Sequence, residues 1–116
     1  MASIKKTWRL YTGPDGESHI EPIDIEKQSD WLKGLATTQI SFSVWPKDRF
    51  IDWHPAPRRQ FVITLSGEAE VEASDGEVRH IGPGTIMLAD DTTGKGHITR
   101  GRGTAERISL FVPLPD

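Results

Sequence analysis

The fold is decided by two stretches of sequence, DWHPAPRRQFVITLSG at residues 52–67 and IGPGTIMLADDTTGKGH at residues 81–97. In the first, residues 59–65 are rich in β-branched and aromatic side chains and end at Ser66-Gly67, which predicts a strand followed by a turn. The second has an apolar strand pattern at 85–89 between two Gly-rich turns. Each stretch carries one histidine beside a strand end, so the fold and the site depend on whether the two stretches converge.

The sequence on either side of these stretches predicts further short strands. Their spacing is short and regular, as in a sandwich or barrel. Asp75-Gly76 is the strongest hairpin signal, and Ile40, Phe42 and Val44 share one face of the first strand of the series. The predicted strands are 37–45, 49–54, 68–74, 77–81, 98–100 and 105–112.

The N-terminal part predicts peripheral structure. Residues 7–12 and 17–25 have strand patterns, and Pro22 limits the second to an edge strand or an extended arm. Residues 26–35 give the helix candidate, a single turn capped by Ser29 or a loop. We therefore predict one all-β domain over 1–116, with N-terminal edge strands and arm at 1–36 and a barrel core at 37–112.

Composition excludes several classes of function. The chain has 116 residues and a formal net charge of −3, which argues against a nucleic-acid-binding face. It has no cysteine, so neither disulfides nor thiol chemistry is available. No apolar run is long enough for a membrane span, and the N-terminal residues lack the apolar core of a signal peptide. These features predict a cytoplasmic domain without nucleic-acid or membrane partners.

From about Trp53 to Arg100 the chain resembles the cupin family, small β-barrels of jelly-roll topology. That family has two motifs, G-x5-H-x-H-x3,4-E-x6-G and G-x5-P-x-G-x2-H-x3-N. Gln60, followed by six residues and Gly67, matches the Glu and the closing Gly of the first motif. Gly84 resembles the Gly of the second motif, with Gly82 in place of its Pro. WHPAPRRQ together with DDTTGKGH is similar to small bacterial cupins that mostly lack an assigned activity.

The resemblance implies a metal site that this sequence changes. Metal-binding cupins hold Fe, Mn, Ni or Zn with three histidines and a carboxylate. The matching positions here are His54, Ala56, Gln60 and His97, the last displaced by a longer loop. Two imidazoles and an amide make a weak site. Asp52, Asp90 or Asp91 could complete it, and Asp52 is favoured because it lies two residues from His54 on a regular strand.

Other polar residues near His54 are candidates for holding a substrate. Gln60 shares a strand face with Val62 and Thr64, and a lumen-facing amide needs partners, either a ligand or the protein itself. Adjacent Arg58 and Arg59 point to opposite faces, so at most one enters the cavity, where it would bind a carboxylate or phosphate. Trp53 is either a core or interface residue or part of the cavity wall.

The remaining motifs have simpler explanations. The loop DDTTGKGH at 90–97 lacks the spacing and the following helix of a phosphate-binding loop, so it predicts a self-bonded loop or a lid over the cavity. His19 and His80 lie on predicted edge or surface strands and are expected to be structural or solvated. No serine has a readable His–Asp partner, so acyl transfer has no support.

Three functions follow. The first is an isomerase, lyase or oxygenase acting on a small polar or carboxylated molecule, with His54 and His97 as acid/base groups or ligands of a divalent ion. The second is a non-catalytic small-molecule-binding cupin with a degenerate metal site. The third, a structural oligomer, requires that side chains fill the cavity. Because small cupins commonly dimerise, the resemblance implies a homodimer, and the strands at 7–12 and 17–25 are the expected edge material.

Overall fold

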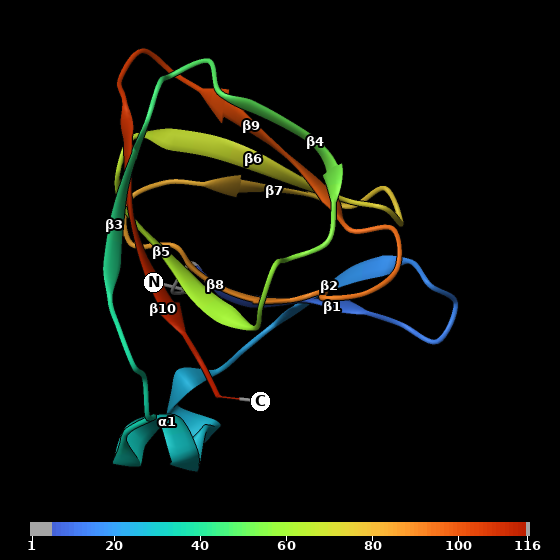
Figure 1. Ribbon diagram of the computed structural model, residues 1–116, viewed down its shortest axis with the longest axis vertical. Coiled ribbons are helices and arrows are strands. Elements are labelled where there is room, and N and C mark those ends of the chain that lie inside the picture. Colours follow the sequence, from blue (N-terminus) through green and yellow to red (C-terminus); the bar gives the residue numbers. More distant parts are fainter. Residues whose placement is uncertain (1–5, 116) are drawn as a thin grey trace, which may run out of the picture.

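The computed structural model describes residues 6–115, which form an all-β fold of two facing sheets (Figure 1). The all-β, jelly-roll class predicted from the sequence is confirmed, with the strands hydrogen-bonded as two separate sheets. The strands are β1 (Thr7–Thr12), β2 (Ser18–Pro22), β3 (Ser41–Trp45), β4 (Phe50–His54), β5 (Gln60–Ser66), β6 (Glu68–Ala73), β7 (Val78–Ile81), β8 (Ile86–Asp90), β9 (His97–Arg102) and β10 (Arg107–Pro113).

The larger sheet has six strands in the order β2-β1-β8-β5-β10-β3, and the smaller has four in the order β4-β9-β6-β7. Most neighbouring pairs are antiparallel, which suits short strands joined by Gly-rich turns. In Figure 1 the smaller sheet crosses the upper part of the molecule. Each stretch that decides the fold contributes to both sheets: β4 and β5 come from the first, and β8 and the start of β9 from the second.

Strand β1 is not the edge strand predicted from the sequence. It lies inside the larger sheet, antiparallel to β2 and parallel to β8. Its side chains Trp8 and Leu10 are buried in the core, with Leu10 fully inaccessible. The short alternating pattern suggested an edge, because a local pattern does not reveal the pairing of β1 with β8, a strand far along the chain. Strand β2 does lie at the edge, as Pro22 predicted.

The short helical segment consists of η1 (Ile25–Lys27) and α1 (Ser29–Lys33). The sequence predicted one turn or a loop over 26–35; the structure has two short helical pieces, and the N-cap of α1 is Gln28 rather than Ser29. Trp31 packs edge-on against Phe61, with ring centroids 4.8 Å apart, and so attaches this segment to the outer face of the larger sheet. In residues 6–115 there is no helix with the length and apolarity needed to cross a membrane.

The main core lies between the two sheets. Strand β6 turns Ala69, Val71 and Ala73 inward, where all three are buried, as their alternation with glutamates predicts. On the other side of β6, Glu70 and Glu72 form ion pairs with arginines of β9, Glu70 with Arg102 and Glu72 with Arg100. The sheets therefore meet through apolar side chains, and a cavity interrupts this core.

Candidate functional site

A cavity of about 250 Å³ lies between the two sheets. Its wall combines apolar side chains with a few polar ones, as in most small-molecule sites. A purely structural oligomer would require that side chains fill the interior. The cavity shows that they leave space there. The lining residues are Trp45, Ile51, His54, Ala56, Pro57, Gln60, Val62, Val71, Ile81, Met87, Ala89, His97, Thr99, Arg107 and Phe111.

The two predicted histidines meet in this cavity. His54 ends β4 and His97 begins β9, and the two residues are paired in the antiparallel ladder. Their ring centroids are 4.5 Å apart and the rings are tilted by 52°. His97 is buried and His54 is partly exposed, so one imidazole is deep in the site and the other lies nearer to solvent.

A buried carboxylate orients His97. Oδ2 of Asp91 lies 2.5 Å from Nδ1 of His97, and Asp91 is fully inaccessible to solvent. Because a carboxylate can only accept, Nδ1 of His97 donates and Nε2 is left for the cavity. Asp91 is itself held by its backbone carbonyl, which accepts from the Ala56 amide at 2.9 Å. Its second oxygen, Oδ1, is buried and has no partner within residues 6–115.

The backbone orients His54 in the same way. Its Nδ1 lies 2.8 Å from the carbonyl oxygen of Asp52, so Nδ1 donates and Nε2 is again the free nitrogen. The two imidazoles therefore share one cavity with both Nδ1 atoms engaged. Each of these basic nitrogens can accept a proton or donate its lone pair to a metal cation.

The carboxylate of Asp52 does not join His54, contrary to prediction. Ile51 pairs with Thr99 and His54 pairs with His97. From one pair to the next, β4 advances by three residues and β9 by two, so β4 contains a bulge. Both Ile51 and His54 therefore face the cavity, and Asp52 is exposed. Its Oδ1 accepts from the Trp53 amide at 2.9 Å. A regular strand would have placed Asp52 and His54 on one face, and the extra residue removes that relationship.

Arg107 is a site residue that the sequence analysis missed. It opens β10, is 5% exposed and lines the cavity. Its guanidinium donates to the Thr64 hydroxyl at 3.2 and 3.4 Å and lies over the Trp45 ring, 5.5 Å from the centroid. Burial lowers the pKa of Arg107 to about 10, so it keeps its charge at neutral pH. The sequence signal was an arginine at the start of a strand, on the same face as Ser109 and Phe111.

No carboxylate among the described residues pairs with Arg107. A buried cation without an anion is unusual, because desolvation is costly unless a counter-charge offsets it. Gln60 pairs with Pro113 at the far end of the strand that Arg107 begins. The amide and the cation therefore approach the cavity from opposite ends of β10.

The predicted substrate residues separate into two groups. Gln60 is buried and lines the cavity, as predicted from its face of β5. Arg58, Arg59 and Trp53 are not part of the cavity lining. Arg59 pairs with Asp90 at 3.4 Å in a polar hollow beside the helical segment, and Trp53 is 47% exposed. Arg58 is exposed beside a smaller hollow that shares Gln60 with the cavity. The inward arginine is Arg107.

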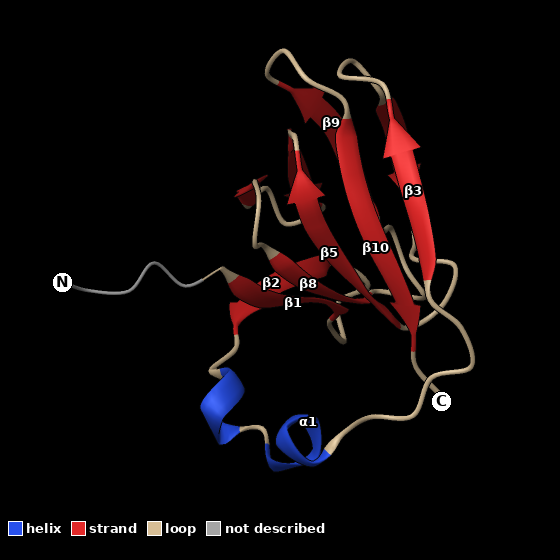
Figure 2. Cartoon of the chain, turned by 90° about the vertical axis from the view of Figure 1, so that its left-hand side faces the viewer, coloured by secondary structure: helices blue, strands red, loops and turns tan. Residues whose placement is uncertain are grey.

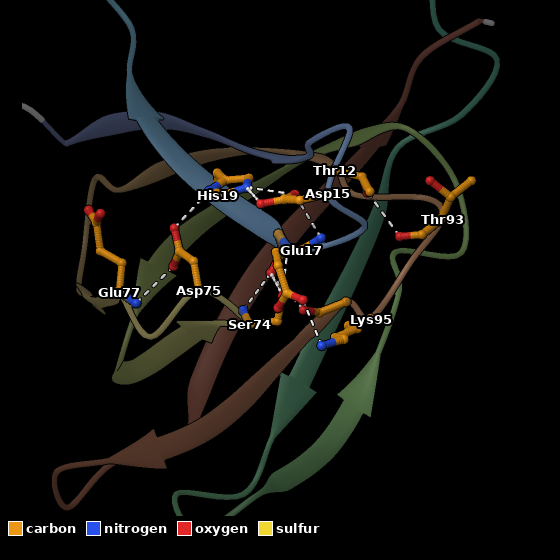
Figure 3. Close-up of polar contacts among 11 residues, drawn as sticks. Thr12, Asp15, Glu17, His19, Ser74, Asp75, Glu77, Thr93 and Lys95 are labelled. Carbon is orange, nitrogen blue, oxygen red and sulfur yellow. Dashed lines mark hydrogen bonds and ion pairs between the residues drawn. The ribbon is translucent and has the colours of Figure 1, made fainter.

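The tip of the β1–β2 hairpin holds the loop that carries Asp91 and His97 (Figure 3). The Thr12 hydroxyl donates to the Thr93 carbonyl at 2.9 Å, and Lys95 forms an ion pair with Glu17 at 2.6 Å. The Ser18 hydroxyl donates to the carbonyl of Gly96, next to His97, at 2.7 Å. The loop at 90–97 is therefore tied to a neighbouring hairpin.

His19 anchors that hairpin to the β6–β7 turn. Its two ring nitrogens lie 3.0 Å from Asp15 Oδ1 and 3.0 Å from Asp75 Oδ2 (Figure 3). The hydrogen bond to Asp15 is the largest cause that raises the pKa of His19, and Asp75 adds to it. In turn, the bond to His19 lowers the pKa of Asp15. His19 is thus structural, as predicted, and it supports the side of the hairpin that holds the site loop.

Neither a family model nor a curated protein matches the chain. A solved structure similar to it is that of a conserved protein of unknown function from Streptococcus pyogenes. The two share 25% identity and a TM-score of 0.51 over 66% of this chain and 64% of that one, less than two thirds of its length. The likeness agrees with the all-β fold and gives no activity.

Proposed function

We propose that this protein binds a small carboxylated molecule in the cavity between its sheets and transfers a proton at that molecule. The observation that carries the proposal is Arg107, a buried cation that lines the cavity and lacks a carboxylate partner among residues 6–115. A guanidinium prefers a bidentate carboxylate partner. The proposal includes the cupin resemblance, supported by the facing sheets and by the meeting of His54 and His97.

The ligand would lie along the cavity with its carboxylate at Arg107 and a second polar group near Gln60. These two side chains come from opposite ends of the β5–β10 ladder. Between them the wall is apolar, with Val62, Met87 and Phe111 among its members. The cavity of about 250 Å³ limits the ligand to a small organic acid with a short carbon skeleton.

Proton transfer is assigned to the Asp91–His97 pair. With Nδ1 of His97 bonded to Asp91, its Nε2 accepts a proton from the bound molecule, and the carboxylate stabilises the imidazolium that forms. His97 then returns this proton to the molecule, or passes it to Nε2 of His54, whose ring centroid is 4.5 Å away and which lies nearer to solvent, for exchange with water. This chemistry fits an isomerase or lyase that acts on a carbon next to a polarised group.

The test uses deuterium exchange. Small 2-oxo and 2-hydroxy acids are titrated by calorimetry, and those that bind are incubated in D₂O with the protein. Nuclear magnetic resonance then measures exchange at the carbon next to the carboxylate or carbonyl. We expect affinity to fall roughly 10- to 150-fold in Arg107→Met and exchange to be lost in His97→Asn. Arg79→Gln, a surface arginine of β7 paired with Glu77, is the matched control.

Binding without exchange would favour the second candidate, a non-catalytic carboxylate-binding module. Binding that persists unchanged in Arg107→Met would refute the assignment of the anion to this cavity. Either outcome is read on folded protein, verified by circular dichroism.

The free Nε2 atoms also support a divalent ion as a second candidate occupant. The donors would be the two imidazoles and the Gln60 amide oxygen, with Asp91 as the partner that orients His97. When bound, such an ion would polarise a ligand oxygen. In residues 6–115 no group of three or more His, Asp or Glu side chains is arranged to hold a metal. Elemental analysis tests this occupant. A bound ion should be found in the wild-type protein and should be missing from His54→Ala.

A further inference from the structure

A second hollow, called the outer hollow below, adjoins the cavity at its Gln60 end. It has a volume of about 220 Å³ and shares Pro57, Gln60 and Phe111 with the cavity wall. Arg58 and Ser41 also line it, and both are exposed to solvent. A ligand that extends past Gln60 therefore enters the outer hollow and approaches the surface there.

Three adjacent strands of the larger sheet build the outer hollow. Gln60 begins β5 and pairs with Pro113 at the end of β10, while Ser41 begins β3 and pairs with Phe111. The Thr37 hydroxyl donates to the Pro113 carbonyl at 2.7 Å and so fastens the segment before β3 to the end of β10. Figure 2 shows β5, β10 and β3 side by side, with the chain that leads into β3 passing the end of β10.

Gln60 is a buried amide without a partner in the protein. It is 7% exposed, and its side chain makes no hydrogen bond with any group of residues 6–115. Its polar atoms are not sealed in the core, as Oδ1 of Asp91 is, because Gln60 lines both the cavity and the outer hollow. Buried side-chain amides normally have a hydrogen-bond partner. The amide of Gln60 is therefore placed to bind a polar group of a ligand.

The cavity and the outer hollow are lined by cations and by no acid. Arg107 lines the first and Arg58 the second, and neither pairs with a carboxylate of residues 6–115. Among the described residues no Asp or Glu lines either space, although the chain has a formal net charge of −3, and Asp91 is fully inaccessible. The polar hollow beside the helical segment differs, because Arg59 pairs with Asp90 there. Two arginines without acidic partners favour a ligand with two negative charges.

The strand geometry sets the distance between the two anion positions. The Arg107 guanidinium lies 3.2 Å from the Thr64 hydroxyl, and Thr64 shares a face of β5 with Gln60, four residues away. At about 3.3 Å per residue, these two positions are about 13 Å apart. A hydrogen bond of about 3 Å at each end leaves roughly 7 Å between the outer oxygens of the ligand. A chain of about four to six carbons spans that distance.

We propose that the ligand is a dicarboxylic acid of about four to six carbons, with one carboxylate at Arg107 and the other between Gln60 and Arg58. This inference rests on the proposed function, because it identifies the second group of the molecule that the same cavity binds. The Gln60 amide donates to the second carboxylate from the buried side, and the Arg58 guanidinium donates to it from the solvent side.

Calorimetry with two ligands of equal length tests the second anion position. Glutarate and its half-amide, glutaramate, differ by one negative charge. We expect the wild-type protein to bind glutarate roughly 10-fold more tightly at low salt, because a hydrogen bond between charged groups is stronger than one to a neutral amide. Arg58→Gln should reduce this preference to about 3-fold or less, since an exposed ion pair contributes modestly. Arg79→Gln, the surface control used above, should leave it unchanged.

Gln60→Glu is the second variant, because it keeps the shape of the side chain and adds a negative charge. It should repel the second carboxylate and reverse the preference, so that glutaramate binds more tightly than glutarate. Circular dichroism verifies that this variant folds. In the wild-type protein, affinity across the series from malonate to pimelate should be highest for diacids of about four to six carbons.

The outcomes separate this inference from the proposed function. Equal wild-type affinity for glutarate and glutaramate, or a preference that survives in both Arg58→Gln and Gln60→Glu, overturns the dicarboxylate assignment. The proposed function then stands, because one carboxylate still binds at Arg107. Binding of a short 2-oxo acid without binding of any diacid has the same meaning. Glutarate affinity that is unchanged in Arg107→Met, or no binding by any of these acids, refutes the proposed function and this inference together.

Discussion

Nδ1 of His97 lies 2.5 Å from Oδ2 of Asp91; both side chains are buried, and His97 lines the cavity. The contact links the start of β9 to the residue that follows β8. It fixes which imidazole nitrogen faces the ligand, because the carboxylate takes the hydrogen of Nδ1. The contact gives a role to a buried aspartate whose second oxygen, Oδ1, has no partner among residues 6–115.

Asp91→Asn should release His97 from this orientation. The amide can donate to Nδ1, which would move the hydrogen to Nε2 and remove the free nitrogen from the cavity. We expect ligand proton exchange to fall by about 10²-fold or more, the scale of a general base. Nitrogen-15 spectra of the His97 imidazole check the tautomer directly. Unchanged tautomer and unchanged exchange would show that Asp91 acts only in packing.

Arg107→Met should weaken carboxylate binding while keeping the fold. Hydrogen bonds to charged groups contribute about 1.5–3 kcal/mol, so we expect affinity to fall by roughly 10- to 150-fold. The ligand-free protein should lose little stability, because methionine removes a desolvated cation that lacks a carboxylate partner among residues 6–115. Calorimetry measures the affinity and urea unfolding the stability. A large drop in stability with binding retained would assign Arg107 to the core instead.

Gly96→Ala should be more damaging than Gly76→Ala. Both glycines have positive φ, +76° and +97°, so each alanine carries about 1–2 kcal/mol of backbone strain. At Gly96 the new methyl group would also overlap the carbonyl of His54, whereas at Gly76 it enters open space. Overpacking adds about 1–3 kcal/mol at Gly96. Urea unfolding compares the two, and equal losses would mean that the β4–loop contact relaxes freely.

The hairpin that holds the site loop should loosen as pH rises. The bonds to Asp15 and Asp75 raise the pKa of His19. The stability that charged His19 gives the hairpin is therefore complete below about pH 6.5, the ordinary pKa of histidine, and is lost as pH rises through the pKa of the folded state. The bond to His19 lowers the pKa of Asp15, so the stability that the Asp15 carboxylate gives the hairpin is complete above about pH 4 and is lost as pH falls below that value. Hydrogen exchange of the β1–β2 turn checks this. His19→Gln should remove the alkaline change, and an unaltered profile in that variant would contradict the mechanism.

Local sequence signals identified much of the strand framework. The Gly67, Asp75-Gly76 and Gly82-Pro83-Gly84 turns separate short apolar runs, and alternation in β6 gave the correct inward face. The same signals placed His54 and His97 at strand ends that could meet. These features follow from neighbouring residues, because turn chemistry and period-two alternation are properties of a few consecutive positions.

Tertiary structure decided the chemistry of the site. The bulge in β4 turned Asp52 away and kept Ile51 and His54 inward, and one extra residue is enough to invert a strand face. Asp91 became the partner of His97, and Arg107 became the inward cation in place of Arg58 or Arg59. Which side of a strand meets a cavity, and which strands are neighbours, depends on pairing between distant segments. The parallel pairing of β1 with β8 has the same origin.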